Sequence, residues 1–433
     1  QRIGSPRFIA APMVAQSELA FRLLTKSHGA DLAYTQMIHA RCFVEDKKYR
    51  QDSIDWRAED YIPQVESPVS AHELDKHLIV QFAGDCPDTL ARAASLVQAD
   101  ANVVAVDLNL GCPQKIAKKG HYGAYLLHEK ELVASLLTSM VQSVDVPVTA
   151  KIRRLQTDAE TLEVAHAIEQ AGVSMLTVHG RTADSKKAYT GPVDWDIIQR
   201  IKQSVSIPVI ANGGVSSRAD ALACLAYTGA DGVMSSEGLL ENPRLFSEAG
   251  SAAFDSDIDH IESQLCTVEE YLHLLSAFPA RAASTAHVAR AHIFKILYRF
   301  LDAPKNADLR LRLGLCEFEE IPDVVVALRK RMQPYARLGG GEGGPGGVEQ
   351  AQKDGLLGHT LWYWRHRDLR ASMRTISTPR RKHGHGAGST GQEDAVRLRL
   401  QQQQLKDRLL AQRAARGLVE DRKGTSAMNY MYK

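Results

Sequence analysis

The sequence predicts a parallel (β/α)8 barrel of the TIM type, followed by a smaller all-helical domain and a flexible, basic C-terminal extension. Residues 1–246 of the 433 contain eight short β-like runs that begin about 32 residues apart, which is room for one strand and one helix each. The β signal then disappears as far as residue 335. From Arg337 onwards 18 basic residues accompany 9 acidic ones, whereas the preceding part holds 35 and 42.

The composition narrows the class of protein. Hydrophobic residues make up 44% and charged residues 24%, which is typical of globular proteins. No apolar run approaches the 18 or more residues of a membrane span, so we expect no membrane protein. The six cysteines form no CxxC pair, and we therefore expect neither a zinc site nor a disulfide scaffold, and no metal.

Cysteine usage also bears on location. Scattered single cysteines favour a reducing compartment, and we expect a cytoplasmic monomer. The nucleus is an alternative, as is an organelle, because the sequence starts at Gln1 rather than Met and a targeting peptide could precede it.

The eight runs form the predicted barrel strands. Their β-branched cores suit a parallel sheet that is buried on both faces. A doubly wound open sheet is the alternative, but almost every run ends in a polar or reactive side chain, and only in a barrel do these ends converge on one mouth. The runs are 7–13, 32–38, 78–84, 105–113, 147–154, 175–181, 208–215 and 232–238. The longer connection over 51–77 is expected to be an exposed surface excursion without chemistry.

Three parts follow from these patterns: a catalytic barrel over 1–246, a helical domain over 247–336, and a Gly-rich linker with a largely disordered tail over 337–433. The tail includes a candidate helix over 395–416. In the second part apolar residues recur at helical spacing. These stripes are Tyr271, Leu274, Leu275 and Phe278; Ile293, Ile296, Leu297, Phe300 and Leu301; and Val324, Val325 and Leu328.

The fourth run ends in Leu-Asn-Leu-Gly-Cys-Pro, over 108–113. A glycine before Cys112 and a proline after it predict a tight turn that exposes the thiol. A lone cysteine is more often a small buried hydrophobe, but its place at a barrel mouth favours a catalytic role. No histidine lies near it in the sequence to deprotonate it. With an ordinary pKa of about 8.5 the thiol would be protonated at neutral pH, which suits a proton donor better than a nucleophile.

The later strand ends favour an anionic ligand. Lys151 and His179 close the fifth and sixth runs, and ANGGV (211–215) and SSEG (235–238) follow at the seventh and eighth, where barrels of this type frequently bind phosphate. No GxGxxG fingerprint follows any run, so a monophosphate cofactor is favoured over a dinucleotide domain. Flavin mononucleotide (FMN) fits, with Gln81 at the edge of its ring and Lys151 stabilising the charge of the reduced ring.

These stretches together resemble the tRNA-dihydrouridine synthase family. The resemblance covers roughly residues 3–335, and its Lys-Gly-His-Tyr-Gly-Ala and Ser-Glu-Gly stretches are similar to the eukaryotic branch that acts on D-loop uridines 16 and 17. The matching blocks are APM (11–13), QFAGDCPD (81–88), LNLGCPQKIAKKGHYGAYLL (108–127), KIR (151–153), VHGRT (178–182), ANGG (211–214) and GVMSSEGLLENP (232–243).

The resemblance implies a reaction and a site. NADPH, or NADH, would reduce FMN, and the enzyme would then reduce the C5=C6 bond of a uridine in the tRNA D-loop to dihydrouridine, with Cys112 as the active-site acid. The helical domain would bind tRNA. The implied FMN contacts are Pro12, Met13, Val14, Gln81, Lys151, His179, Asn212, Gly213, Gly214, Ser236 and Glu237. The candidate substrate contacts are Asn109, Arg153 and Arg181, with His292, Lys295 and Arg299 on one predicted helical face.

Two other functions stay open at this point. An FMN barrel could act on a free pyrimidine, although such a substrate needs neither a helical domain nor a basic tail. A catalytically inactive RNA-binding homologue is the second alternative, and the presence of Cys112, Lys151 and His179 argues against it.

Overall fold

The computed structural model describes residues 2–57, 75–185, 191–248, 258–336, 347–358, 363, 403, 404, 407 and 411. These residues fall into two compact units. One unit comprises the described residues of 1–253 and 270–288, and the other those of 254–269 and 289–424.

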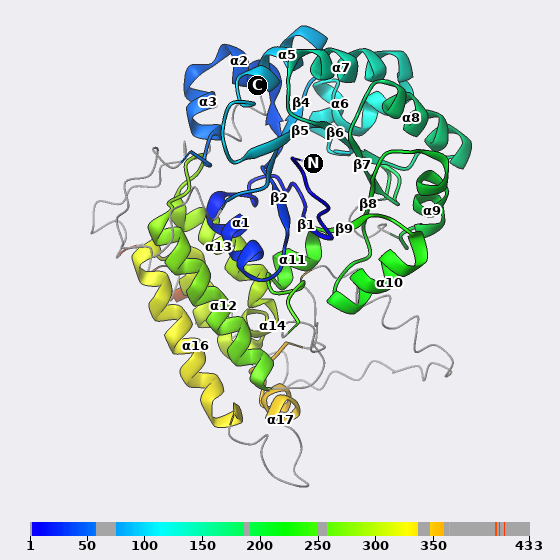
Figure 1. Ribbon diagram of the computed structural model, residues 1–433. Helices are drawn as coiled ribbons and strands as arrows, with labels where there is room; N and C mark the ends of the chain where they lie inside the picture. The colour runs from blue at the N-terminus through cyan, green and yellow to red at the C-terminus, as the bar shows by residue number, and fades with distance from the viewer. Residues whose placement is uncertain are drawn as a thin grey trace. The chain divides into compact units, whose positions relative to one another are not determined.

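The first unit is a closed barrel of eight parallel strands with helices around it (Figure 1). Each strand pairs with the next, and the last pairs with the first through Ile9 and Met234, so the ring has no open edge. The predicted (β/α)8 barrel is therefore confirmed. The strands in ring order are β1 (Phe8–Ala10), β2 (Leu32–Tyr34), β4 (Leu78–Ala83), β5 (Val103–Leu110), β6 (Val148–Arg153), β7 (Met175–His179), β8 (Val209–Asn212) and β9 (Gly232–Ser235).

The second predicted strand, over 32–38, is interrupted. β2 ends at Tyr34, and a separate two-residue strand, β3 (Ile38–His39), pairs with β4 further along the barrel. Thr35 lies at the break, where its hydroxyl oxygen accepts the backbone N–H of Gln81 at 3.1 Å in place of a main-chain acceptor.

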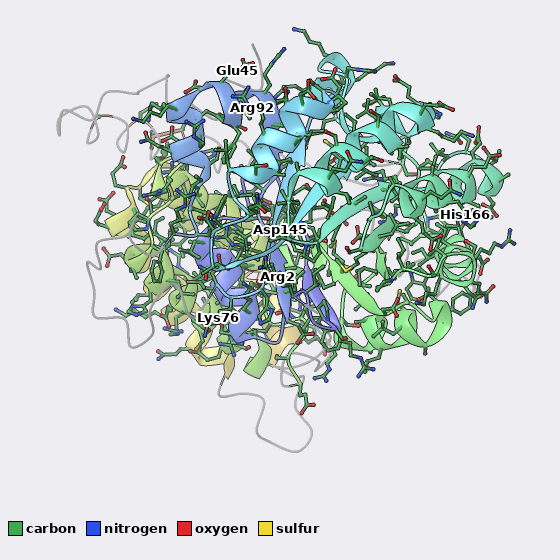
Figure 2. The ribbon with its side chains drawn as sticks, turned by 45° about the horizontal axis from the view of Figure 1, so that its top comes forward. Arg2, Glu45, Lys76, Arg92, Asp145 and His166 are labelled. Atoms are coloured by element: carbon green, nitrogen blue, oxygen red, sulfur yellow. The ribbon has the colours of Figure 1, made fainter. Side chains whose placement is uncertain are left out.

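Helices surround the ring. Side chains on their outer faces and in the loops, such as the exposed Arg92 and Asp145, project into solvent (Figure 2). Several helices have recognisable start signals: Thr157 and Glu160 form a capping box, and Asp194 and Ser217 each cap a helix with their side chains. The helices are α1 (Leu19–Ser27), α2 (Ala40–Glu45), α3 (Lys47–Ser53), α5 (Pro87–Ser95), α6 (Lys115–Lys119), α7 (Lys130–Ser143), α8 (Asp158–Gln170), α9 (Trp195–Ser204), α10 (Arg218–Thr228) and α11 (Glu237–Glu241), with a 3-10 helix, η2 (Gly123–His128).

The barrel interior is layered. An apolar cluster from seven strands fills the part of the interior nearer the amino ends of the strands, and it includes Ile79, Ala105, Met175 and Ile210. Side chains alternate along a strand, so the next inward-facing residue lies two positions later. At these later positions the buried side chain is polar: Gln81, Asp107, Thr177 and Asn212. A polar layer therefore separates the apolar core from the mouth.

The prediction that residues 51–77 form an exposed surface excursion is wrong at both ends of this connection. Ile54 and Trp56 are 5% and 1% exposed, and Asp75 is completely buried. Arg22 of α1 makes salt bridges to both Asp55 and Asp75, which fixes the two ends of the connection against the barrel. The middle of the excursion, 58–74, lies outside the described residues.

Helices dominate the rest of the described chain, as predicted. Members of each predicted apolar stripe, such as Leu275, Ile293 and Leu328, are buried. The end of α12, from Glu270, belongs to the barrel unit, where Ala277 and the following Phe278 pack with Leu19 and Leu23 of α1. The elements are α12 (Ile258–Ala277), α13 (Thr285–Ile296), α14 (Tyr298–Leu301), η5 (Pro304–Asn306), α15 (Ala307–Leu315), η6 (Phe318–Glu320), α16 (Ile321–Ala336) and α17 (Gly347–Lys353).

The predicted tail over 337–433 lies mostly outside the described residues, and of the candidate helix over 395–416 only 403, 404, 407 and 411 are described. Within the part of the chain that the structure describes, no helix is long and apolar enough to cross a membrane.

Candidate active site

The predicted site residues of the barrel lie at or just beyond the carboxyl ends of its strands. Because the strands are parallel and form a closed ring, these ends surround one mouth. By strand they are Pro12, Met13 and Val14 after β1; Gln81 on β4; Asn109 and Cys112 on and after β5; Lys151 and Arg153 on β6; His179 and Arg181 on and after β7; Asn212, Gly213 and Gly214 on and after β8; and Ser236 and Glu237 after β9.

The turn that carries Cys112 is held from two sides. The side-chain oxygen of Asn109 accepts the backbone N–H groups of Gly111 and Cys112 at 3.1 and 3.0 Å. From the other side, the N–H of Ala124 donates to the carbonyl of Cys112 at 3.1 Å. Gly123 has φ +71°, and a Cβ there would lie 2.8 Å from that carbonyl oxygen. The motif predicted the turn, but the return contact from 123–124 was not predicted.

The Cys112 thiol lies in a mostly apolar setting. Its side chain packs against a cluster that contains Met37, Ala83 and Tyr122, and Val14 packs on the same cluster. Burial raises the pKa of the Cys112 thiol, although a backbone hydrogen bond and the charges of Arg153 and Lys151 oppose the rise. The thiol is therefore protonated at neutral pH, as a proton donor requires.

Strand register places the cationic candidates side by side. Asn109 is paired with Lys151, Arg153 with His179, and His179 with Asn212. Arg153 also reaches the cysteine turn, because its Nε donates to the carbonyl of Gly111 at 2.9 Å.

Electrostatics at this mouth favour an anion. Burial and the neighbouring charge of Arg153 together lower the pKa of Lys151 to about 7. The pKa of His179 falls well below 6.5, first through burial and then through Arg153 and Lys151, and burial also lowers the pKa of Arg153. Desolvation and mutual repulsion both disfavour these cations, and an anionic ligand would oppose that repulsion. This set of donors fits the phosphate or the negatively charged ring of FMN.

Glycine at the end of β8 is required by the protein's own packing. Gly213 has φ +104°, and a Cβ there would lie 2.7 Å from Cδ2 of the His179 ring. Asn212 is 3% exposed, and its Nδ2 donates to the carbonyl of Met234 at 2.9 Å. Ser236 and Glu237, at the start of α11, are half-buried.

Asp107 is a residue that the motif analysis missed. It is fully buried and accepts hydrogen bonds from Gln81 Nε2 at 2.8 Å and from the Thr149 hydroxyl at 2.6 Å. Gln81 in turn accepts from Asn109 Nδ2 at 2.7 Å. Gln81 is itself completely buried, so its expected contact with a cofactor ring stays a prediction. The available signal was an acid two residues before Asn109 in an otherwise apolar strand.

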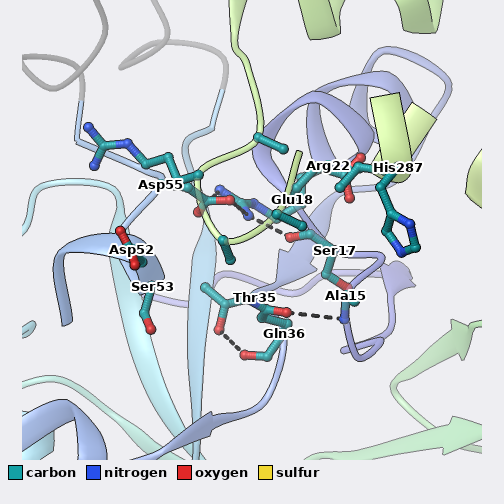
Figure 3. A pocket seen from close by; sticks show the side chains of 15 residues that line it. Ala15, Ser17, Glu18, Arg22, Thr35, Gln36, Asp52, Ser53, Asp55 and His287 are labelled. Atoms are coloured by element: carbon teal, nitrogen blue, oxygen red, sulfur yellow. Dashed lines mark hydrogen bonds and ion pairs between the residues drawn. The ribbon is translucent and has the colours of Figure 1, made fainter. Parts of the chain in front are cut away.

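A pocket in the barrel unit lies beside the turn after β1 and shares no residue with the predicted set (Figure 3). Gln36 accepts the N–H of Ala15 at 3.1 Å along its wall. The lining residues are Ala15, Ser17, Glu18, Arg22, Thr35, Gln36, Asp52, Ser53, Asp55, Ala280, Arg281, Ala282, Ala283, His287 and Val288.

The predicted basic face of the helical part is not continuous. α13 ends at Ile296 and Arg299 belongs to α14, so Arg299 does not share one helix with His292 and Lys295. His292 is completely buried, and Lys295 is only 9% exposed, with its Nζ donating to the carbonyl of Ala291 at 2.5 Å. Neighbouring side chains cover His292, and its expected contact with the tRNA stays a prediction.

Two further cations of the helical part are engaged in ion pairs. Arg329 pairs with Glu262 and Glu269, and Arg331 pairs with Asp308. Among the residues described, no group of three or more His, Cys, Asp or Glu side chains is placed to hold a metal ion.

Comparison with known proteins identifies the family. The family model described as "Dihydrouridine synthase (Dus)" matches residues 9–322. A mouse protein named tRNA-dihydrouridine(16/17) synthase (NAD(P)(+))-like is 38% identical over 332 residues, which is 76% of this chain and 63% of the mouse protein. Two proteins named tRNA-dihydrouridine(16/17) synthase (NAD(P)(+)) are also 38% identical. The match to the Schizosaccharomyces pombe protein covers 76% of this chain and 79% of that protein. The match to the Saccharomyces cerevisiae protein covers 72% of this chain and 70% of that protein.

One solved structure similar to this chain is more distant in sequence than these relatives. The crystal structure of TcOYE with pHBA is 10% identical and covers 55% of this chain and 87% of its own, with a TM-score of 0.39, which is too low to bear on function. The family match and the three relatives agree with the strand-end motifs: the chain belongs to the dihydrouridine synthase family.

Proposed function

We propose that this chain is a tRNA-dihydrouridine synthase that reduces the C5=C6 bond of a uridine in the tRNA D-loop, at position 16 or 17. The observation that carries the proposal is a protonated thiol, Cys112, held in a tight turn at the mouth that also gathers Lys151, Arg153 and His179. Relatives whose names specify positions 16 and 17 support the choice of uridine.

The proposed cofactor is FMN, with NADPH or NADH as the reductant. The names of the relatives support the nicotinamide, and the gathering of Lys151, Arg153 and His179 on adjacent strands supports an anionic group at the mouth. When bound, the reduced flavin supplies a hydride to C6 of the uracil ring. The residues proposed to hold it are Pro12, Met13, Val14, Gln81, Lys151, His179, Asn212, Gly213, Gly214, Ser236 and Glu237.

Cys112 is assigned the proton half of the reaction. The C5=C6 bond of uracil is conjugated with a carbonyl, so C5 needs a proton once C6 has gained a hydride. In our proposal the S–H bond of Cys112 breaks, C5 takes the proton, and the thiolate regains one from solvent, which the partly exposed side chain can reach. Lys151 and Arg153 lower the energy of the thiolate during this interval.

Substrate access requires the target uridine to leave its stacked position in the tRNA, at a cost of a few kcal/mol. We propose that the helical unit contributes to holding the tRNA. Because His292 is buried and Arg329 and Arg331 are paired with carboxylates, exposed cations such as Lys330 are better candidates for phosphate contacts than the predicted stripe.

The test is Cys112→Ala, with Cys86→Ala as the matched control because Cys86 is exposed and lies at the start of α5. We expect Cys112→Ala to lower dihydrouridine formation in tRNA about 100-fold or more while flavin content and NADPH oxidation stay unchanged. Equal activity of the two variants would overturn the role of Cys112. Turnover of free uracil or uridine in preference to tRNA would instead favour a free-pyrimidine reductase.

A further inference from the structure

A buried series of hydrogen bonds runs from the middle of the barrel to the Cys112 turn. Asp107 accepts from Gln81 Nε2, Gln81 Oε1 accepts from Asn109 Nδ2, and Asn109 Oδ1 accepts from the turn. Strand register explains the contacts, because Gln81 is paired with Asp107 across β4 and β5, and Asn109 is the next inward-facing residue on β5. Asp107, Gln81 and Asn109 are hereafter the hydrogen-bond series.

The series has a direction that its two ends impose. The oxygen and nitrogen of a carboxamide are normally hard to tell apart, but here the neighbours decide. An ionised Asp107 can only accept, so Gln81 must turn its NH2 group toward it and its oxygen toward Asn109. Asn109 must then donate to Gln81, which leaves its oxygen for the N–H groups of Gly111 and Cys112. The N–H groups of Gly111 and Cys112, which can only donate, require the same orientation of Asn109 from the other end.

We propose that Asp107 is a positioning residue for Cys112: through the hydrogen-bond series its carboxylate orients the Asn109 side chain that closes the turn. For its functional meaning the inference rests on the proposed role of Cys112. Asp107 does not contact the thiol. Its effect is to select one orientation of two amides, so that the acceptor at the end of the series faces the turn.

The charge state of Asp107 supports this direction. Burial raises the pKa of Asp107 to about 6, while hydrogen bonds from Thr149 and Gln81 and the charge of Lys151 oppose the rise. The carboxyl is therefore ionised at neutral pH despite being buried. A buried carboxylate is costly unless donors surround it, and both of its oxygens have one.

The decisive variants replace a carboxylate by a carboxamide, or a carboxamide by a carboxylate, within the hydrogen-bond series. In Asp107→Asn the side chain keeps its shape, but it accepts more weakly and can present either end to Gln81. The double variant Asp107→Asn with Gln81→Glu moves the carboxylate from position 107 to position 81. Glu at 81 still accepts from Asn109, and Asn at 107 can donate to it while accepting from Thr149. Thr177→Val is the control, because it removes a buried hydroxyl from the same polar layer and touches none of the hydrogen bonds of the series.

The measurement is amide hydrogen exchange of the full-length protein, resolved at Gly111 and Cys112. We expect Asp107→Asn to speed their exchange roughly threefold to tenfold, as loss of one hydrogen bond allows, while the N–H of Ala124 and the strand amide of Val106 keep their protection. The double variant should restore wild-type exchange, and Thr177→Val should leave it unchanged.

Three results would overturn the inference: unchanged exchange in Asp107→Asn, an equal loss of protection at Ala124 and Val106, or no restoration in the double variant. Should Asp107→Asn fail to fold, the double variant alone must match the wild type. The kinetic counterpart is a fall in kcat for dihydrouridine formation with an unchanged KM for tRNA. If amide exchange behaves as expected but Cys112→Ala stays active, the proposed function fails while the positioning stands.

Discussion

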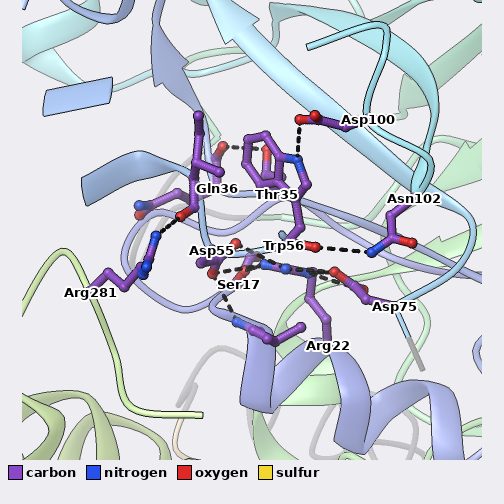
Figure 4. A network of polar contacts seen from close by, with 12 residues as sticks. Ser17, Arg22, Thr35, Gln36, Asp55, Trp56, Asp75, Asp100, Asn102 and Arg281 are labelled. Atoms are coloured by element: carbon purple, nitrogen blue, oxygen red, sulfur yellow. Dashed lines mark hydrogen bonds and ion pairs between the residues drawn. The ribbon is translucent and has the colours of Figure 1, made fainter. Parts of the chain in front are cut away.

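The salt-bridge cluster around Arg22 offers a sharp test of what anchors the 51–77 connection (Figure 4). Arg22 is 1% exposed, and its Nη2 lies 2.7 Å from Asp75 and 2.9 Å from Asp55. Lys26 Nζ approaches the second oxygen of Asp75 at 2.8 Å. Two cations and two carboxylates thus balance each other, and Asp75→Asn would leave one buried positive charge without compensation.

Removing one partner of a buried ion pair costs about 3–5 kcal/mol, because the remaining charge stays desolvated. We expect Asp75→Asn to lower the free energy of unfolding of the barrel unit by about this amount. Lys48→Ala is the control, since the Lys48 side chain is 70% exposed in its pair with Asp52 and should contribute less than about 1 kcal/mol. Urea unfolding can be followed by tryptophan fluorescence, to which Trp56 contributes, because it is 1% exposed and follows Asp55 directly.

The pH dependence of this loss has a defined sign. Burial alone would raise the pKa of Asp75, but Arg22 and Lys26 outweigh burial and hold it below its ordinary value. The stability that Asp75 contributes is therefore present above about pH 4 and is lost as the pH falls further. The difference between wild type and Asp75→Asn should shrink in acid. A loss at pH 7 no larger than that of Lys48→Ala would refute the reasoning.

Three further predictions concern the barrel mouth. Because the pKa of Lys151 is about 7, an anionic ligand should bind more tightly as the pH falls, with a Kd for FMN about tenfold lower at pH 6 than at pH 8 in fluorescence titrations, and Lys151→Met should abolish this dependence. Gly123→Ala should lower the Tm and slow dihydrouridine formation because its Cβ meets the Cys112 carbonyl, whereas Gly229→Ala, at φ +66° with open space around it, should show strain in the Tm alone. The pKa of Asp107, raised to about 6, should make the wild type lose about 3 kcal/mol of stability as the pH rises from about 3 to 7, and urea titrations of Asp107→Asn should lack this slope.

The sequence was sufficient for features that depend on neighbouring residues or on regular spacing. Eight evenly spaced runs predicted the barrel, and Gly111, Cys112 and Pro113 predicted the turn, because a tight turn is a local property. Strand ends in a barrel converge by topology, so placing Lys151 and His179 at one mouth required only the correct fold.

The sequence analysis missed features that depend on strand register or on burial by neighbouring side chains. The role of Asp107 depends on its hydrogen bonds with Gln81 and Thr149. These residues lie 26 and 42 positions away in the sequence and contact Asp107 only because of strand pairing. The contacts of Arg22 with Asp55 and Asp75 likewise span 33 and 53 residues. Helical spacing placed His292 on a face, but spacing does not say which side chains cover that face.

The pKa shifts of Cys112 and Lys151 at the barrel mouth have burial as their main cause. Burial raises the pKa of Cys112 and lowers that of Lys151, so both groups favour their neutral forms when the mouth is desolvated. An anion beside Lys151 would favour the protonated amine, and the positive charge of Lys151 in turn lowers the pKa of the Cys112 thiol. The protonated amine of Lys151 thus favours the thiolate of Cys112 more than its neutral amine does. Because Asn109 on β5 is paired with Lys151 on β6, the same strand pair that holds the turn also sets the distance over which this coupling acts.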